Sequence, residues 1–350
     1  IDLESKPDIR TMRSSVPPSN PSDKVRASAR KVMELIRSDE EPLVRIDEAK
    51  LEEEIKTNLD KYKVQKEVGD SWTRWDFHFS DPKNPDLTAQ YVLVLDALNF
   101  CFWPLPGYEY EHLAGAIKAV AERDPTLLGA ENLAKIDEET LQNWLLASFK
   151  SNEEDRKGIT IPGIEERARF LREVGCALLE DFEGKATNLI KNAKGSAINL
   201  VRLVCRHFPG FRDHCVFRGK QVFFLKRAQI FVGDVYGAFE GKGLGALKDM
   251  DKLTCFPDYR IPQLLHHLKI MCYSKSLDAK IQSKAEIVAG SEEEIAIRAA
   301  TVVAVEWIQR ILSKYGRDAS VYQLDWMLWE RGEAILTEIG PHHRTKTVYY

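Results

Sequence analysis

The sequence has few cysteines and no long apolar run, and both absences restrict what the protein can be. Its six cysteines stand singly, without a Cys-x-x-Cys pair or a matching histidine spacing, so no zinc-site pattern is present. No uncharged apolar stretch of about 18 residues or more occurs, which argues against a transmembrane helix. The opening segment has neither an apolar core nor the arginine-rich composition of a transit peptide. We therefore expect a soluble, cytoplasmic protein with reduced thiols and no membrane partner.

Motifs of the common enzyme classes are also missing. The glycines of Gly241–Gly245 lack the spacing of a phosphate-binding loop and a preceding buried strand, so a flexible loop is predicted there. No serine-nucleophile elbow, paired-histidine zinc motif or calcium loop occurs. With 50 Lys and Arg against 54 Asp and Glu, the net charge of −4 provides no general basic field for a duplex or an anionic membrane. Any chemistry must therefore come from local groups of residues.

Helical periodicity dominates the rest of the sequence. With 44% apolar and 30% charged residues the chain has ample material for a core, and only residues 1–21, with four prolines, are predicted to be a flexible polar arm. No linker interrupts residues 22–350, so we predict one mainly α-helical domain. Helices are predicted from residue 22 onward, over 47–59, 108–123, 137–149, 162–182 and 186–207, from 226 onward and over 291–314.

A small two-stranded β element is predicted between residues 72 and 106. Apolar and polar side chains alternate over Trp75–Phe79, and Tyr91–Leu95 is a short β-branched and aromatic run. The segment between these two runs is rich in turn-forming residues, as expected for a connection between paired strands. A further short strand is predicted at Gln221–Leu225, directly before a helix.

The segment Leu253–Gln263 places an acid on a stiff turn. Pro257 and Pro262 bracket Asp258 and Arg260, and the second proline suits the first turn of a new helix. Such a turn suits a carboxylate that must be aimed at a ligand. The alternative is that Asp258 caps the helix or pairs with Arg260, and the pattern leaves both interpretations open.

Asp325 is surrounded by apolar and aromatic residues in Leu324–Glu330. Burying a carboxylate costs several kcal/mol unless it is paired, so this acid either lies at a helix end or is placed for a ligand. The alternative is a surface acid on an amphipathic helix whose Trp326 and Trp329 face the core. The sequence does not decide between them.

Two further segments carry charge in unusual places. Lys226 begins a predicted helix that also contains Asp234, and a cation at a helix start opposes the helix dipole, so we expect an anionic partner, either a protein acid or a phosphate. The tail His342–Arg344 could hold a phosphate, although an exposed polar terminus is the commoner explanation. His78, beside aromatic residues, is more often a hydrogen-bonded core histidine than a ligand contact.

Five short segments, in this order along the chain, resemble the queuosine salvage family, the queuosine 5'-phosphate N-glycosylases. They are Leu95–Pro104, Lys226–Ile230, Phe256–Gln263, Asp325–Trp329 and the closing His343–Tyr350. Each alone would be a weak signal, whereas five in order are a strong one, and the likeness extends from about residue 22 to the end. One departure is Pro257, where members usually have a small residue, and this can change how Asp258 is presented. The polar arm is the other departure.

The resemblance implies hydrolysis of the N-glycosidic bond of queuosine 5'-monophosphate, which yields queuine and ribose 5-phosphate. It also implies an all-helical fold related to the helix-hairpin-helix DNA glycosylases, with no metal and no organic cofactor. Those relatives place a catalytic aspartate after a helical hairpin, and Asp258 is the matching acid here. A carboxylate beside C1' stabilises the oxocarbenium-like sugar and can activate water.

The chemistry of this substrate suggests which residues bind it. Carboxylates and a histidine suit the ammonium and diol of the base, aromatic faces suit its ring, and a cation suits the phosphate. The residues that we expect to bind substrate are His78, Trp103, Lys226, Asp234, Phe256, Arg260 and Asp325.

Two other functions stay open at this point. A glycosylase for a damaged base in DNA or RNA would need a basic, groove-sized face, which the net charge of −4 does not favour. A helical binding module without catalysis could use the tryptophan-rich segments as an interaction surface. The near-neutral charge fits a mononucleotide better than a polynucleotide partner.

Overall fold

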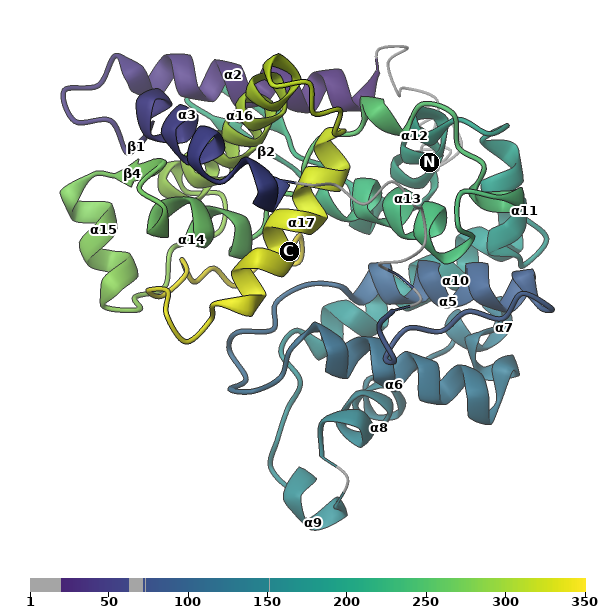
Figure 1. Cartoon of the computed structure of the whole chain (residues 1–350). Coiled ribbons are helices and arrows are strands. Elements are labelled where there is room, and N and C mark those ends of the chain that lie inside the picture. The colour runs from purple at the N-terminus through teal and green to yellow at the C-terminus, as the bar shows by residue number, and fades with distance from the viewer. Residues whose placement is uncertain (1–19, 63–71, 73, 151) are drawn as a thin grey trace, which may run out of the picture.

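Helices make up most of the chain, as the sequence predicts (Figure 1). The structure, a computed structural model, describes residues 20–62, 72, 74–150 and 152–350. Its helices are α2 (Pro21–Arg37), α3 (Glu48–Thr57), α5 (Pro85–Leu98), α6 (Tyr110–Arg123), α7 (Ala130–Leu133), α8 (Glu138–Phe149), α9 (Glu153–Arg156), α10 (Ile164–Asp181), α11 (Ala186–Asn192), α12 (Ala197–His207), α13 (Lys226–Ala238), α14 (Arg260–His267), α15 (Lys275–Gln282), α16 (Glu292–Lys314) and α17 (Val321–Ala334).

Side-chain caps explain why several helices begin close to the predicted residues. The Asn20 side chain accepts a hydrogen bond from the backbone N–H of Ser22, and Asp47 and Asp137 cap α3 and α8 in the same way. Ser291 accepts from the N–H of Glu294 at the start of α16. The predicted arm, residues 1–21, lies outside the described residues except for its last two, which form the cap and first position of α2.

The predicted strand pair between residues 72 and 106 is wrong. Tyr91–Leu95 lies inside α5, whose residues from Thr88 to Leu98 are all buried. A helix that is buried all round has no polar face, so its apolar run looks like a strand in sequence. The other predicted strand, Trp75–Phe79, consists of turns and irregular backbone.

Two small antiparallel sheets are present elsewhere in the described chain. A hairpin joins β2 (His214–Phe217) to β3 (Lys220–Phe223), which confirms the strand predicted near residue 221. Arg218 and Gly219 form its turn with φ of 47° and 75°, the left-handed values that a two-residue hairpin needs. The other sheet pairs β1 (Val44–Ile46) with β4 (Met271–Tyr273), two short strands far apart in the sequence.

The helix predicted over residues 186–207 is divided in two. Lys194 and Gly195 have φ of 54° and 70°, so the backbone leaves the right-handed region after α11. The Ser196 side chain then caps α12 by accepting from the N–H of Asn199.

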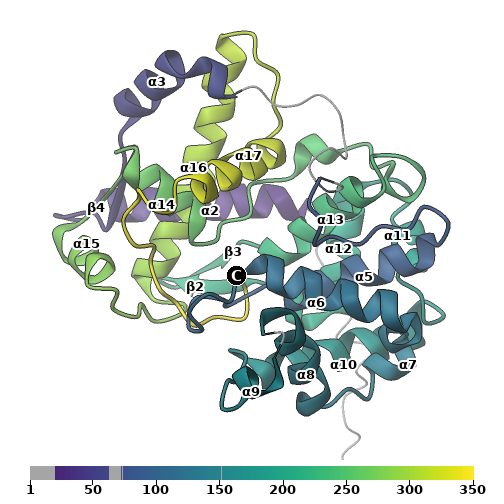
Figure 2. The same ribbon diagram turned by 60° about the horizontal axis from the view of Figure 1, so that its bottom comes forward.

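One continuous apolar cluster extends from Val25 in α2 to Leu328 in α17. In both views the C-terminal end of the chain lies at the centre of the molecule, between the α5, α6, α8 and α10 group and the α14–α17 group (Figure 2). The first and the last of the five family-like segments meet here, because the backbone N–H of Cys101 donates to the carbonyl oxygen of Tyr350 at 2.9 Å. None of the helices in the described ranges is long and apolar enough to cross a membrane. The relationship to helix-hairpin-helix glycosylases stays a prediction.

Candidate active site

A pocket with aromatic walls opens between α13, α17 and the turn before α14. Its polar lining is mostly acidic, and Lys226 is the one Lys or Arg among the described residues that line it. Such a pocket suits a flat ring that carries polar or cationic groups. The aromatic lining residues are Trp72, Trp75, Phe77, His78, Phe102, Tyr110, Phe256, Tyr259, Trp326, Trp329 and Tyr350.

Asp258 lines this pocket from the turn that precedes α14. Its Oδ1 accepts a hydrogen bond from the backbone N–H of Arg260 at 2.8 Å, so the expectation of a helix-start contact is confirmed. The alternative of an ion pair with Arg260 is wrong, because that guanidinium donates to Glu333 at 2.6 Å and to Gln263 at 2.7 Å. Within the described chain no second hydrogen bond reaches the half-buried Asp258 carboxylate. One oxygen is therefore fixed, and the other is available to a ligand.

Asp325 lies deep in the same pocket, so the interpretation as a surface acid is wrong. Its side chain, in α17, is 5% exposed, and its Oδ1 accepts the backbone N–H of Phe256 at 2.6 Å. Burial, followed by the nearby negative charge of Asp258, raises the pKa of Asp325 well above its usual range. The hydrogen bond also fixes Phe256, whose ring forms part of the wall.

Lys226 is the first residue of α13 and is 4% exposed. Burial lowers its pKa, and the negative charges of Asp258, Asp96 and Asp325 oppose that shift. Protein acids are thus close to Lys226. Of the two anionic partners expected for this residue, a protein acid or a phosphate, the structure contains the first. An anionic ligand in the pocket would compete with these acids for Lys226.

Asp234, in α13, lines the pocket, and the negative charge of the buried Asp96 in α5 lies close to it. Burial raises the pKa of Asp234 well above its usual range, and burial also raises the pKa of Asp96 to about 7. Ionising both of two adjacent buried carboxyls has a high free-energy cost, so the pair retains at least one proton near neutral pH. The sequence analysis missed Asp96, although this residue lies in one of the five family-like segments.

His78 is both a packed histidine and a lining residue of the pocket. Its Nδ1 lies 3.0 Å from the carbonyl oxygen of Trp72 and its Nε2 lies 2.9 Å from the hydroxyl of Tyr110. The carbonyl can only accept, so Nδ1 carries the hydrogen and the Tyr110 O–H donates to Nε2. The ring stacks on Trp72 with 3.8 Å between centroids, and burial lowers its pKa to about 4. His78 is therefore neutral and orients the aromatic wall.

Two residues that the sequence analysis expected to bind substrate lie outside the pocket lining. Arg260 is held by Glu333, as described above, and Trp103 donates its indole N–H to the carbonyl of Thr345 at 3.0 Å. The Arg344 guanidinium lies over the Trp103 ring, 5.4 Å from its centroid. Trp103 therefore holds the C-terminal segment, and the structure does not place it against a ligand in the pocket.

The C-terminal histidines are also packed inside the protein. His342 stacks on Tyr259 at 4.4 Å between centroids, and His343 lies with its Nε2 3.2 Å from the Tyr350 hydroxyl. Burial lowers the pKa of His342 to about 4 and that of His343 to about 3, so neither carries charge near neutral pH. Of this tail, Tyr350 alone is among the described pocket-lining residues.

Six of the eight residues singled out in the sequence meet in this one pocket: His78, Lys226, Asp234, Phe256, Asp258 and Asp325. Sequence reasoning missed Tyr110 and the acids Glu111, Glu330 and Glu333, for which no motif gives a signal. No group of three or more potential metal-ligating side chains is found in the described ranges, and the expectation of a metal-free site stays a prediction.

Comparison with known proteins gives one consistent result. A family model described as "Queuosine salvage protein" matches residues 77–350. A protein of Dictyostelium discoideum is 43% identical over 313 residues, covering 88% of this chain and 94% of its own length. One from Sphaerobacter thermophilus is 42% identical over 290 residues, covering 80% of this chain and 86% of its own. One from Mus musculus is 31% identical over 296 residues, covering 78% of this chain and 85% of its own length. All three are named "Queuosine 5'-phosphate N-glycosylase/hydrolase".

Proposed function

The chain belongs to the queuosine salvage protein family, and we propose that it hydrolyses the N-glycosidic bond of queuosine 5'-phosphate. The products are queuine and ribose 5-phosphate, and the freed base can be returned to transfer RNA. The observation that carries the proposal is a pocket in which an aimed carboxylate, a buried cation and aromatic walls meet. These are the groups that an N-ribosyl nucleotide requires.

Asp258 is the proposed catalytic residue. As the C1'–N bond breaks, its electron pair passes to the departing base and positive charge develops on the ribose. A preorganised carboxylate next to C1' stabilises that charge. The oxygen of a water molecule then bonds to C1', Asp258 accepts the proton that the water loses, and this proton passes on to the nitrogen of the departing base, so that queuine leaves neutral and the carboxylate is restored. The hydrogen bond from Arg260 to Oδ1 supports this role, because it keeps the carboxylate oriented before substrate arrives.

The buried acids are proposed to face the base. Queuine is a 7-deazaguanine, so a purine's N7 is absent and cannot be protonated as the base departs. Asp234 and Asp325 have raised pKa values, and a neutral carboxyl can donate a hydrogen bond to another edge of the ring. Phe256 and the tryptophans beside it provide faces for stacking.

The secondary ammonium of queuine is proposed to lie at the pocket mouth. Glu111 and Glu330 line the pocket with side chains that are 51% and 34% exposed. A carboxylate near solvent holds a cation without the desolvation cost of the deeper acids, and Glu330 already pairs with the Arg74 guanidinium in this way. The sequence analysis expected a carboxylate for the ammonium but named neither of these two acids.

Lys226 is the proposed contact for the 5'-phosphate. The competing candidates are otherwise engaged: Arg260 is paired with Glu333, and His342 and His343 are packed and neutral. The charge of Lys226 lies near Asp258, so a phosphate held there would bring the attached ribose close to the proposed catalytic carboxylate. A charge-assisted contact of this kind favours the nucleotide over the nucleoside.

Incubation of the purified protein with queuosine 5'-phosphate tests the proposal. We expect chromatography to show equal amounts of queuine and ribose 5-phosphate, with no base released from guanosine 5'-phosphate, which lacks the cationic arm. Tight binding of queuosine 5'-phosphate without release would instead indicate a binding module. Release of a damaged base from a DNA duplex would indicate a base-excision glycosylase.

A further inference from the structure

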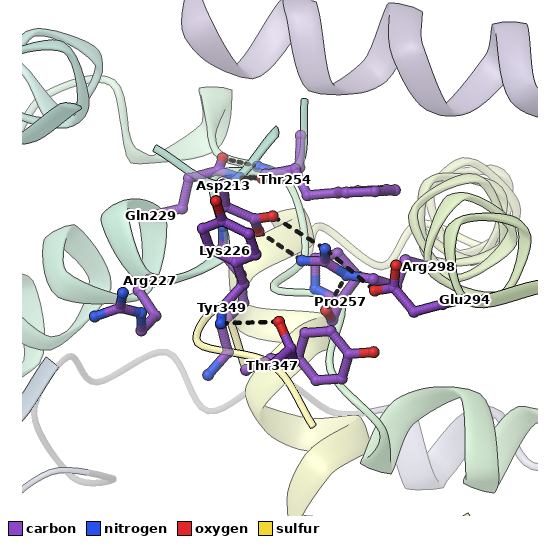
Figure 3. A network of polar contacts seen from close by, with 12 residues as sticks. Asp213, Lys226, Arg227, Gln229, Thr254, Pro257, Glu294, Arg298, Thr347 and Tyr349 are labelled. Atoms are coloured by element: carbon purple, nitrogen blue, oxygen red, sulfur yellow. Dashed lines mark hydrogen bonds and ion pairs between the residues drawn. The ribbon is translucent and has the colours of Figure 1, made fainter. Parts of the chain in front are cut away.

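A buried ion pair lies behind the pocket and contacts three of the segments that form it (Figure 3). Arg298 of α16 donates from Nη1 and Nη2 to the Asp213 carboxylate at 3.0 and 2.6 Å. Both side chains are 2% exposed, and Glu294 lies 3.5 Å from the same guanidinium. Neither Arg298 nor Asp213 lines the pocket.

The first contact reaches the turn that carries Asp258. The Nε–H of Arg298 donates to the carbonyl oxygen of Pro257 at 3.1 Å. The proline ring already restricts φ at this residue, and the hydrogen bond fixes the peptide group that follows it. Asp258 is thus held through the preceding carbonyl by Arg298 and through its own Oδ1 by the N–H of Arg260.

The second contact reaches the helix that carries Lys226. Asp213 Oδ2 accepts the backbone N–H of Lys226 at 3.0 Å, and the Asp213 carbonyl accepts the N–H groups of Phe224 and Leu225 at 3.0 and 3.1 Å. Leu225 has φ of 54°, a conformation that needs such support in a residue other than glycine. The ion pair therefore fixes the start of α13 as well.

The third contact reaches the C-terminal residue of the pocket lining. The Arg298 guanidinium lies over the rings of both Phe224 and Tyr350, 4.1 and 4.6 Å from their centroids. Figure 3 shows how Arg298 lies among Asp213, Glu294 and Pro257, which come from different parts of the chain. The Arg298 guanidinium thereby helps to fix the positions of Asp258, Lys226 and Tyr350 relative to one another.

We propose that Arg298, paired with Asp213, is a positioning residue for the glycosidic cleavage: it sets Asp258 and Lys226 in their mutual orientation without touching the substrate. The inference rests on the proposed function. A displacement of about 1 Å at a reacting group can lower a rate on the order of 100-fold, so loosening this contact should lower kcat more than it changes substrate binding.

Arg298→Lys is the first test variant. Lysine keeps a positive charge opposite Asp213, but a single ammonium cannot reproduce the planar fork that reaches Asp213 and the Pro257 carbonyl together. We expect kcat to fall roughly 10- to 100-fold while KM changes by less than about threefold. Leu141→Ala, a truncation in the buried face of α8, is the control for loss of stability and should retain kcat.

A cycle with Asp258→Asn separates positioning from general weakening of the fold. If Arg298 acts through Asp258, Arg298→Lys should have little further effect on single-turnover rates once the carboxylate is gone. If Arg298→Lys does not fold, the triple replacement of Arg298→Met, Asp213→Asn and Glu294→Gln, which removes the buried cation and both acids beside it, is used in the same cycle. If Arg298→Lys lowers the single-turnover rate by the same factor in wild type and in Asp258→Asn, the positioning role is overturned. A wild-type protein without turnover would overturn the proposed function itself, which is a different result.

Discussion

Replacing Lys226 with methionine tests the proposed phosphate contact. Methionine has a similar length and apolar stem, so the substitution removes the charge from a residue that is 4% exposed without leaving a large cavity. A hydrogen bond to a charged group contributes about 1.5–3 kcal/mol, and about 1.4 kcal/mol corresponds to a factor of ten. We therefore expect kcat/KM for queuosine 5'-phosphate to fall about 10- to 150-fold, whereas kcat/KM for the nucleoside queuosine should change little.

The ratio of the two kcat/KM values is the informative quantity, because it cancels any loss that Lys226→Met causes through folding or through the neighbouring acids. Arg260→Met is the matched control, since Arg260 is a buried cation that pairs with Glu333. That control should lower stability and leave the preference for the nucleotide unchanged. The assignment of the phosphate to Lys226 is refuted if Lys226→Met lowers kcat/KM equally for the nucleotide and the nucleoside. It is also refuted if Arg260→Met abolishes the preference for the nucleotide.

Three further predictions concern the acids and the packing. Asp96 has a pKa of about 7 in the folded protein, above that of an unfolded aspartate, so its contribution to stability is complete below about pH 4 and is lost as pH rises toward 7. Urea unfolding should therefore show Asp96→Asn gaining stability relative to wild type between pH 4.5 and 7.5, and a difference independent of pH would contradict this. The free energy of unfolding of Asp325→Leu should be about 1–3 kcal/mol lower than that of Asp325→Asn, because leucine leaves the Phe256 N–H unpaired. Equal free energies of unfolding for the two variants would show that this hydrogen bond contributes nothing to stability. Gly175→Ala should lower the melting temperature, because a Cβ there would lie 2.3 Å from the backbone nitrogen of Ala134; an unchanged melting temperature would contradict this close packing of α10 on α7.

Local signals explain why much of the fold could be predicted from sequence. Helix starts at residues 21, 48, 138 and 292 follow capping side chains, and these contacts span only two or three residues. The wrong prediction over Tyr91–Leu95 has a tertiary cause, since α5 is buried on every side and shows no amphipathic period. The pairing of β1 with β4 depends on contacts between distant segments that no local pattern encodes.

The candidate site was predictable where unusual residues stood out from their surroundings. Asp258 between prolines, Asp325 among aromatics and Lys226 at a helix start all conflict with local preference, and all three meet in the pocket. Trp103 and Arg260 were equally conspicuous but serve as packing and ion-pair partners outside it.

The ion pair behind the pocket gave no signal of its own in the sequence. Asp213 is an ordinary charged residue just before β2 and Arg298 is one in the long helix α16, and the Pro257 carbonyl that Arg298 contacts belongs to a third segment. Their role follows only from the way the fold brings these three segments together.

The turnover of Asp258→Asn, measured beside its affinity for queuosine 5'-phosphate, tests the central claim most directly. Asparagine can keep an oxygen in place to accept the Arg260 N–H, so the turn should persist while the negative charge disappears. We predict that kcat falls by about 10²- to 10³-fold and that the dissociation constant stays within a few fold of wild type. Unchanged turnover in a folded Asp258→Asn protein would contradict the claim and assign the chemistry to another acid.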